Sequence, residues 1–408
     1  MTCGSLDLPS LERSHSAKTA EDLIEIVSTN FRVKRGVELR KIELPTGGFG
    51  VNAVGDNNDS IALGYGKGIH SDIGAFGECI EHFHLWDIRS SQDQHEVEVD
   101  CNFTWVDDIF FKAGNSLNKI KGATKVIPHK VLGTSEIAYV PSLMFGYCSS
   151  GDKSKLDDHE IFYSRYASSN GSAFGFSYHD ALLHAMHEVI ERHEISILFL
   201  ELLSMAPNRC SYDLIDDYSF HPELRPVSGD ILLEENISGL TTLVKKTEFD
   251  TYFSFSFVYR DTGGRKKLIW GAGCSSYRDL AIYRSLTECQ QLLSNNFERV
   301  DDRIDVLAKK YRTFSALEHI DLTSLWVNKT QYQQEPAVRV ETRQQAETLG
   351  QTLRKSGREV LIFRHEPVDC SYSVVTVYIT NTEKFYGVIF ALPVLPISYL
   401  EEWIKQED

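Results

Sequence analysis

The chain has 408 residues, which is long enough for two packed lobes or one large α/β unit with a real core. Apolar residues make up 42% and charged residues 25%, and these ordinary proportions exclude disordered and fibrous classes. The formal charge of −16 is spread along the chain, so binding to nucleic acid or to an anionic membrane is not expected.

The sequence also indicates a compartment. The amino terminus has no basic segment followed by an apolar run, and no apolar stretch reaches the roughly 18–20 residues of a membrane span. Eight cysteines are scattered without a CxxC pair, which argues against a cysteine-rich zinc site and suits a reducing environment. We therefore expect a cytoplasmic protein.

The alternation of apolar runs and turn residues predicts mixed helices and strands. In chain order, the predicted elements are a helix over 20–29, short strands within 31–65, a helix over 72–86, strands and loops over 96–148, a helix over 180–203, a surface connection over 206–240, adjacent strands over 251–260 and 266–273, a helix over 278–297, and a helix followed by two strands within 342–380. This order favours an α/β fold.

Two of the predicted helices carry two glutamates one helical turn apart, and a third carries a glutamate and a glutamine at the same spacing. Residues three apart project from nearly the same side, so each helix presents a pair on one face. The pairs are Glu78 with Glu81, Glu188 with Glu191, and Glu288 with Gln291. Each helix follows a glycine-containing turn, so one turn-and-helix device is predicted to occur three times. The alternative for each pair alone is the solvated face of an amphipathic helix.

The glycine-containing turns suit an anion. Glycine lets backbone N–H groups approach closely, and a helix N-terminus carries partial positive charge, so phosphate is the natural ligand. Carboxylates brought together from separate helices repel one another unless a cation holds them. Mg²⁺ prefers such hard oxygen ligands and shares them with nucleotide phosphates. The sequence therefore predicts a Mg-nucleotide site built mainly from glutamates.

Zinc is the alternative ion for the same helix. The HExxH pattern that begins at His187 has Glu191 in place of its second histidine, and the reversed HxxEH pattern is also absent. A zinc hydrolase site made of His184, Glu188 and either His187 or Glu191 stays open. The chain has no GxxxxGK[ST], HRD or DFG motif, so P-loop NTPases and protein kinases are not supported.

Three ordered blocks resemble the YcaO family of ATP-dependent enzymes, which activate backbone amides of peptides. They are GYGKGIHSDIGAFGECIEHF, SNGSAFGFSYHDALLHAMHEVIERHE and RSLTECQQ, and they are similar to the family's three glutamate helices with their turns. The resemblance covers most of the chain. It implies a YcaO-like α/β fold of mixed sheets flanked by helices, with a Mg-ATP site between them. Residues 1–160 would form the N-terminal part of this domain and 161–408 the C-terminal part.

The resemblance also implies site residues. The implied Mg²⁺ ligands are Glu78, Glu81, Glu188, Glu191 and Glu288. The implied ATP-binding residues are Lys18, Ser71, Asp180, Glu191, Arg192, Arg284 and Gln291. Arg192 and Arg284 would be catalytic because they would stabilise phosphate charge. The alternatives are that Arg192 pairs with Glu188, that Arg284 pairs with Glu288, and that Lys18 is a solvated charge.

The implied reaction is phosphorylation of a peptide amide oxygen by ATP after a nucleophile attacks the carbonyl. A Cys, Ser or Thr side chain of a ribosomally made precursor peptide gives an azoline, which we favour, whereas external sulfide gives a thioamide. Many azoline-forming members end in a PxPxP tail, but this chain has only Pro393 and Pro396 before an acidic end. A non-catalytic nucleotide-binding scaffold is the alternative to an enzyme.

The expected partners follow from the same resemblance. No separate leader-binding domain is expected before residue 20 or after residue 400, so capture of the precursor peptide is expected to need another protein. The family implies an E1-like or leader-recognition protein, or a TfuA-type protein for thioamides. A flavin dehydrogenase in the same complex and a homodimer are both compatible with it. No nucleic acid or membrane partner is expected.

Overall fold

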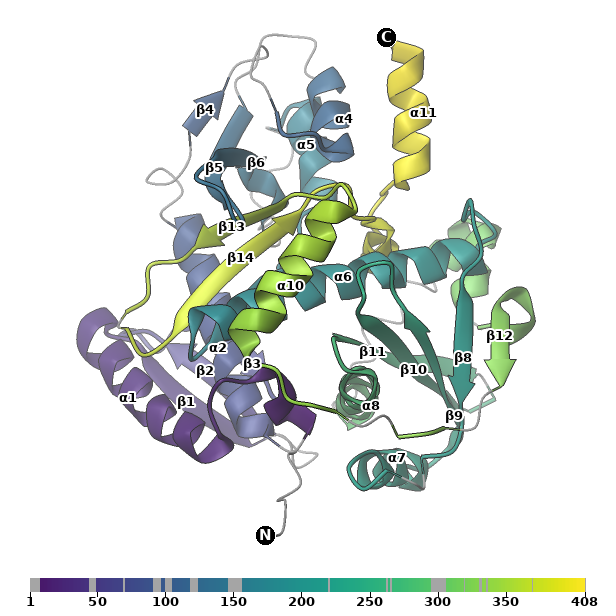
Figure 1. Ribbon diagram of the computed structural model, residues 1–408, viewed down its shortest axis with the longest axis horizontal. Coiled ribbons are helices and arrows are strands. Elements are labelled where there is room, and N and C mark those ends of the chain that lie inside the picture. Colours follow the sequence, from purple (N-terminus) through teal and green to yellow (C-terminus); the bar gives the residue numbers. More distant parts are fainter. Residues whose placement is uncertain are drawn as a thin grey trace.

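The computed structural model describes residues 8–43, 49–68, 70–90, 97–99, 105–117, 124–145, 156–218, 221–261, 263–264, 266–294, 306–318, 320–329, 332–334, 337–368 and 370–407. The described strands form three sheets, and each sheet packs against one of the three glutamate helices. Figure 1 shows helices lying against these sheets, so the predicted α/β fold of mixed sheets flanked by helices is confirmed.

The first sheet is antiparallel and has the strand order β1-β2-β3. The elements of this part are α1 (Ala17–Arg35), β1 (Glu38–Glu43), β2 (Phe49–Val54), β3 (Ser60–Tyr65) and α2 (Ser71–Ser90). Helix α2 packs on β2 and β3, while α1 contacts β1 and α2. The glutamate helix predicted over 72–86 is thus confirmed as α2.

Helix α1 corrects the prediction that strands begin at residue 31. The helix begins after Ser16, whose side chain accepts a hydrogen bond from Thr19 N, and it continues to Arg35. Gly36 then takes a left-handed conformation with φ +64°, which ends the helix. Three basic residues in the last turn favour the helix because they lie at its negative end. The valine in this stretch suggested a strand, but the caps determine the structure.

The second sheet has six strands in the order β4-β5-β13-β14-β7, with β6 paired to β5. The strands are β4 (Val97–Val99), β5 (Thr124–Val131), β6 (Ile137–Pro141), β7 (Ser172–Gly175), β13 (Val360–Arg364) and β14 (Ser373–Ile379). Helix α6 (Tyr178–Leu202) packs on β7 and β14, and α10 (Thr342–Lys355) packs on α6. The helix and two strands predicted within 342–380 are confirmed, and every residue of β14 is buried.

Two further helices belong to this part of the chain. They are α4 (Ile109–Leu117) and α5 (Asp158–Arg165). The prediction of strands and loops over 96–148 is wrong for α4, where Phe110 and Phe111 are fully buried against α5 and the C-terminal helix. Residues 96, 100–104, 118–123 and 146–148 of that prediction lie outside the described residues. The division at residue 160 falls within α5 and stays a prediction.

The third sheet has the order β11-β10-β9-β8-β12. Its strands are β8 (Ser211–Ile215), β9 (Ile237–Lys246), β10 (Tyr252–Asp261), β11 (Lys266–Ser275) and β12 (Trp326–Lys329). Helix α8 (Arg278–Ser294) packs on β10 and β11, and α7 (Leu224–Leu233) packs on α8. The adjacent strands predicted over 251–260 and 266–273 are confirmed as the antiparallel pair β10 and β11. Residues 295–297 of the predicted α8 lie outside the described residues.

The segment 206–240 is not the surface connection that its prolines and acidic residues suggested. It contains β8, α7 and the start of β9, and Tyr212, Leu224 and Ile231 are fully buried. These side chains join the core between the third sheet and α8 or α6. Burial of apolar side chains therefore overrides the local turn signals here.

The chain ends in a helix that the sequence did not suggest. The short 3-10 helix η6 (Phe385–Phe390) follows β14, and α11 (Ile397–Glu407) begins directly after Pro396. Figure 1 shows α11 leading away from α2 and α8 toward the opposite end of the molecule. Among the described helices, none combines the length and the apolar character needed to cross a membrane.

Candidate active site

The glutamate helices share one anchoring contact, which confirms that a single device occurs three times. In each case the first glutamate of the helix accepts a hydrogen bond from a backbone N–H in the strand, or just before the strand, that leads into the same helix. The pairs are Glu78 with Tyr65 N (2.8 Å), Glu188 with Gly171 N (2.9 Å) and Glu288 with Ala272 N (2.9 Å). The backbone therefore fixes one oxygen of each carboxylate.

Glycines in the entering strands allow this contact. A Cβ at Gly64 would lie 2.3 Å from the backbone nitrogen of Cys79, and one at Gly271 would lie 2.3 Å from that of Cys289. Each glycine thus lets its strand pass directly against the helix, beside the glutamate that precedes the cysteine. These two glycines therefore allow close packing of strand and helix.

Glu81 links two of the three units. Its carboxylate accepts a hydrogen bond from Phe174 N in β7, at 2.7 Å, so a side chain of α2 is tied to the strand that enters α6. The aromatic rings of Phe76 and Phe174 also meet edge-on, with centroids 6.0 Å apart. The first and second sheets are therefore held in a fixed relation at the acidic residues.

The five predicted metal ligands lie near one another, and we call them the acidic cluster: Glu78, Glu81, Glu188, Glu191 and Glu288. Burial, together with the nearby charge of Glu78, raises the pKa of Glu81 to about 7. Burial likewise raises the pKa of Glu188 to about 8, against the lowering effect of Arg192. Burial also raises the pKa values of Glu78 and Glu191, and both of these groups are repelled by Glu288.

The alternative of a solvated helix face does not hold. The side chains of Glu191 and Glu288 are only 12% and 17% exposed. Two cations lie among them. Arg192 contacts Glu191 at 3.4 Å and Glu188 at 3.9 Å, and the Nζ atom of Lys67 lies 3.9 Å from Glu288. Burial lowers the pKa of Arg192, but the surrounding carboxylates raise it by more.

The acidic cluster suits Mg²⁺ by its chemistry. Within the part of the chain that the structure describes, no three His, Cys, Asp or Glu side chains converge into a ready-made metal cage. Mg²⁺ does not need one, because it keeps several waters and is usually held by one or two carboxylates together with substrate phosphates. Each of the three anchored glutamates is held to the backbone through one oxygen, and burial together with nearby carboxylates raises the pKa values of Glu81 and Glu188, so a divalent cation would stabilise their charged forms.

The ion pair that Arg284 makes in the structure is with Glu12, whereas the alternative considered from the sequence was Glu288. The Nη2 atom of Arg284 lies 2.8 Å from the carboxylate of Glu12, which is 4% exposed. Glu12 also accepts hydrogen bonds from Ser275 Oγ (2.6 Å) and Ser276 N (3.0 Å), and it lies 3.3 Å from Nδ1 of His187. The buried Glu12 joins α6, α8 and the turn before α8, and His187 and Arg284 hold its pKa well below its usual range against the effect of burial.

Asp180 belongs to the same region. It accepts a hydrogen bond from Ser14 N at 3.0 Å and another from Ser14 Oγ, and it lies beside Arg13. The pKa of Arg13 is lowered by burial and by Arg284, despite the nearby carboxylates of Asp180 and Glu12. Residues 12–14 therefore form a strap, which holds the amino-terminal end of α6 to that of α8.

The remaining predicted residues are placed as follows. Gln291 donates from Nε2 to the carbonyls of Tyr65 (3.2 Å) and Gly66 (3.3 Å), so α8 holds the turn that precedes α2. Ser71 is partly buried at the start of α2. Lys18 is exposed on the first turn of α1, and no ion pair joins it to the acidic cluster among the residues that the structure describes.

Sequence reasoning missed several residues of this site. Glu12 and Arg13 are far from the helices in sequence, and no local pattern marks them. Lys67 lies in the GKG turn, which was a usable signal. His187 contacts Glu12 and Ser276 with its two ring nitrogens, so the structure gives no support to the zinc alternative that used it.

Comparison with known proteins places this geometry in a family. A family model described as "YcaO cyclodehydratase, ATP-ad Mg2+-binding" matches residues 64–383, a span that contains all three glutamate helices. A comparison with curated proteins finds no match. The cofactors expected from the sequence, ATP and Mg²⁺, are thus those of the family's own description.

Solved structures show the same fold. YcaO from Methanopyrus kandleri bound with AMPPCP and Mg²⁺ matches over 93% of this chain and 94% of its own, with a TM-score of 0.63 and 16% identity. A heterocyclase in complex with substrate and cofactor matches over 93% of this chain, with a TM-score of 0.60 and 17% identity, but this chain spans only 54% of its length. The E. coli microcin synthetase McbBCD complex matches over 84% of this chain and 86% of its own, with a TM-score of 0.55 and 12% identity.

At these identities the structural likeness shows the fold alone, whereas the family model matches most of the sequence directly. The matched span begins at the end of β3 and ends at Glu383, shortly after β14, so it takes in all five glutamates of the acidic cluster. The chain therefore belongs to the YcaO family.

Proposed function

We propose that the chain uses ATP to phosphorylate the oxygen of a backbone amide in a ribosomally synthesised precursor peptide, and that the product is an azoline. The observation that supports this most is the acidic cluster, in which carboxylates from three helices on three sheets gather around Arg192 and Lys67.

The proposed reaction proceeds in three steps. The thiol or hydroxyl of a substrate Cys, Ser or Thr attacks the preceding carbonyl carbon and loses its proton. The oxygen of the resulting adduct then attacks the γ-phosphorus of ATP, and ADP leaves. Finally the carbon–oxygen bond breaks, phosphate departs and the nitrogen loses its proton, so the ring closes with a carbon–nitrogen double bond. Phosphorylation is needed because the amide oxygen alone is a poor leaving group.

The residues of the chain have separate tasks in this scheme. Arg192 is held against Glu188 and Glu191 and is oriented by Asn170, whose side-chain oxygen accepts from its Nε at 3.2 Å. Such a fixed cation stabilises charge that develops on the transferred phosphoryl group without reorganising. The second oxygens of the acidic cluster would hold Mg²⁺, which when bound neutralises phosphate charge and aligns the phosphates.

Azoline formation is preferred over thioamide formation because two of the structural neighbours are a heterocyclase and a microcin synthetase. The second of these is a complex of several proteins, which supports a partner protein that captures the precursor peptide. We propose an E1-like or leader-recognition protein for this task.

The decisive experiment is an incubation of the protein with ATP, Mg²⁺ and the short peptide encoded beside its gene, with and without the adjacent partner proteins. Loss of one water mass per ring, dependent on ATP, is the expected result. Exchange of an oxygen for a sulfur when sulfide is added would establish a thioamide instead. No change of mass with every neighbouring protein present would refute both.

A matched pair of variants separates an enzyme from a non-catalytic scaffold. Glu191→Gln alters the acidic cluster, while Glu402→Gln makes the same substitution at an exposed position of α11. If the chain is the enzyme, ATP-dependent mass change disappears in the first variant and persists in the second. A scaffold that only activates a partner would keep the activity in both.

A further inference from the structure

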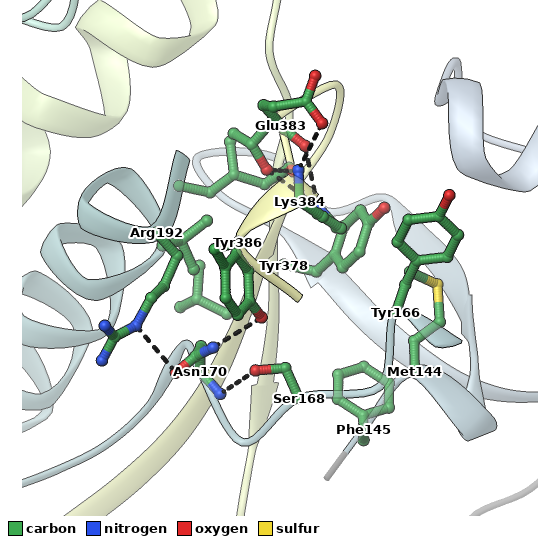
Figure 2. Close-up of a pocket in the computed structure, with 14 residues that line it drawn as sticks. Met144, Phe145, Tyr166, Ser168, Asn170, Arg192, Tyr378, Glu383, Lys384 and Tyr386 are labelled. Atoms are coloured by element: carbon green, nitrogen blue, oxygen red, sulfur yellow. Dashed lines mark hydrogen bonds between the residues drawn. The ribbon is translucent and has the colours of Figure 1, made fainter. Parts of the chain in front are cut away.

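A pocket lies on the side of α6 that faces away from the third sheet, close to the acidic cluster. Including the open space at its mouth, this hollow contains about 470 Å³ that protein atoms do not fill. Its walls come from α6, from β14 and the segment that follows it, and from the end of the short 3-10 helix η2 (Ser142–Met144). Figure 2 shows Tyr386 and Arg192 on one side of this hollow and Met144 and Phe145 on the other.

Arg192 connects this pocket to the acidic cluster. It lines the pocket, and the same guanidinium contacts Glu191 at 3.4 Å. Asn170 continues the wall, because its oxygen accepts from Arg192 Nε (3.2 Å) and its amide nitrogen donates to the Tyr386 hydroxyl at 2.7 Å (Figure 2). If a peptide bond is activated beside Arg192, the side chain of the neighbouring substrate residue would therefore reach this pocket.

The rest of the wall is mostly apolar. Phe145, Tyr166, Val189, Val377 and Tyr378 all line it. The Tyr166 hydroxyl is already occupied, since it donates to the carbonyl of Leu395 and accepts from its N–H. Such a surface releases ordered water when an aliphatic or aromatic side chain enters, and it offers few polar partners to a hydrophilic one.

Charge in the pocket excludes cationic side chains. Glu383 provides the pocket's carboxylate, and its two oxygens already accept from the N–H groups of Lys384 and Ile397, each at 2.9 Å. The ammonium of Lys384 lies over the rings of Phe110 and Tyr378, 4.8 Å and 4.5 Å from their centroids. A Lys or Arg side chain would therefore meet two cations, Lys384 and Arg192, and no free carboxylate among the pocket's lining residues.

We propose that this pocket binds an uncharged apolar side chain of the peptide substrate, from the residue next to the activated amide. The proposal rests on the proposed function for the position of that amide beside Arg192. It adds a rule of substrate choice: positions flanked by an aliphatic or aromatic residue are modified, and positions flanked by Lys or Arg are not.

Photo-crosslinking tests the proposal without requiring turnover. The probe is a capped peptide, acetyl-Gly-photoleucine-Cys-Gly-amide, added with Mg²⁺ and a non-hydrolysable ATP analogue and mapped by mass spectrometry. We expect adducts on the pocket residues Met144, Phe145, Tyr378 or Tyr386. A competing peptide with Phe in place of photoleucine should reduce these adducts, and one with Lys should not. Adducts confined to other surfaces, or none, would overturn the proposal.

Two variants of α6 provide the control. Val189→Phe fills the pocket and should reduce adduct formation about tenfold or more, as expected for loss of an apolar subsite. Ile197→Phe adds the same side chain two turns further along the helix, outside the pocket, and should leave adducts unchanged. Equal adduct yields in both variants would contradict the assignment, provided that their unfolding temperatures show both to be folded.

The outcome is independent of the test of the proposed function. Pocket adducts in a protein that never changes the mass of its precursor would count against the proposed reaction and not against the pocket. Conversely, ATP-dependent modification that is equally fast for flanking Phe and flanking Lys would leave the reaction established and refute the pocket.

Discussion

The buried contact between Glu12 and Arg284 provides a sharp test of how the strap of residues 12–14 holds the site together. Glu12 is 4% exposed, and its carboxylate lies 2.8 Å from the guanidinium of Arg284. The same carboxylate also contacts Ser275, Ser276 and His187. Glu12→Gln keeps the shape of the side chain but removes its charge, so the guanidinium of Arg284 loses its buried counter-charge. We expect the free energy of unfolding to fall by about 3–5 kcal/mol.

A double-mutant cycle of Glu12 and Arg284 shows whether the interaction between the two charges causes this loss of stability. Arg284→Met alone should cost a similar amount, because it leaves the carboxylate of Glu12 buried without its guanidinium. The double variant removes both charges, so its loss should stay near that of one single variant, with a coupling of about 3 kcal/mol. Urea unfolding followed by tryptophan fluorescence gives the four free energies.

A surface pair serves as the matched control for this cycle. Arg343 and Glu347 on α10 make an ion pair at 2.9 Å, but their side chains are 70% and 54% exposed. The same cycle there should show no measurable coupling, because water and salt screen the pair. Simple additivity of the losses at Glu12 and Arg284 would refute the reasoning, since it would mean that the two charges stabilise the fold separately.

Four further outcomes are expected. Glu191→Gln should reduce ATP turnover, measured as phosphate release, by about a hundredfold or more. Gly271→Ala should cost about 1–3 kcal/mol in thermal unfolding, because its Cβ would meet the backbone of α8. Burial lowers the pKa of His129 to about 4, so the unfolded chain binds the proton first and stability falls as the pH drops below about 6.5 toward 4. His129→Gln should remove about 3 kcal/mol of this acid sensitivity in urea titrations. The raised pKa values of Glu81 and Glu188 act in the opposite direction, so chelated protein should lose stability as the pH rises through about 7 and 8, and adding Mg²⁺ with ATP should restore it in a thermal shift series.

The glutamate helices and the strands around them could be predicted because their signals are local. The three-residue spacing of acidic side chains, the glycines before each helix and the apolar runs of β10, β11, β13 and β14 all lie within short windows. Such windows determine element type when burial agrees with the local pattern, as it does along fully buried β14. The internal repeat was visible for the same reason.

The missed elements depend on contacts that no short window contains. Helix α4 follows a loop and owes its form to the burial of Phe110 and Phe111, while α7 lies in a segment rich in acidic and turn residues. The strap is the extreme case, since Glu12 meets Ser275, 263 residues later. A lone glutamate near the amino terminus has no periodicity to mark it, so only the assembled fold reveals its partners.

The anchoring hydrogen bonds explain why this site is built on three separate sheets. A carboxylate alone on a helix could turn to solvent and escape its neighbours, since repulsion in the acidic cluster favours that. Each backbone N–H removes this freedom by holding one oxygen against its own strand, for example Glu288 against Ala272 N. Three identical local units, packed so that their anchored ends face one another, therefore impose a concentration of negative charge that none of them would adopt alone. Burial and the neighbouring carboxylates raise the pKa values of Glu81 and Glu188, so a divalent cation bound with its nucleotide would stabilise their charged forms and with them the assembled arrangement of the three units.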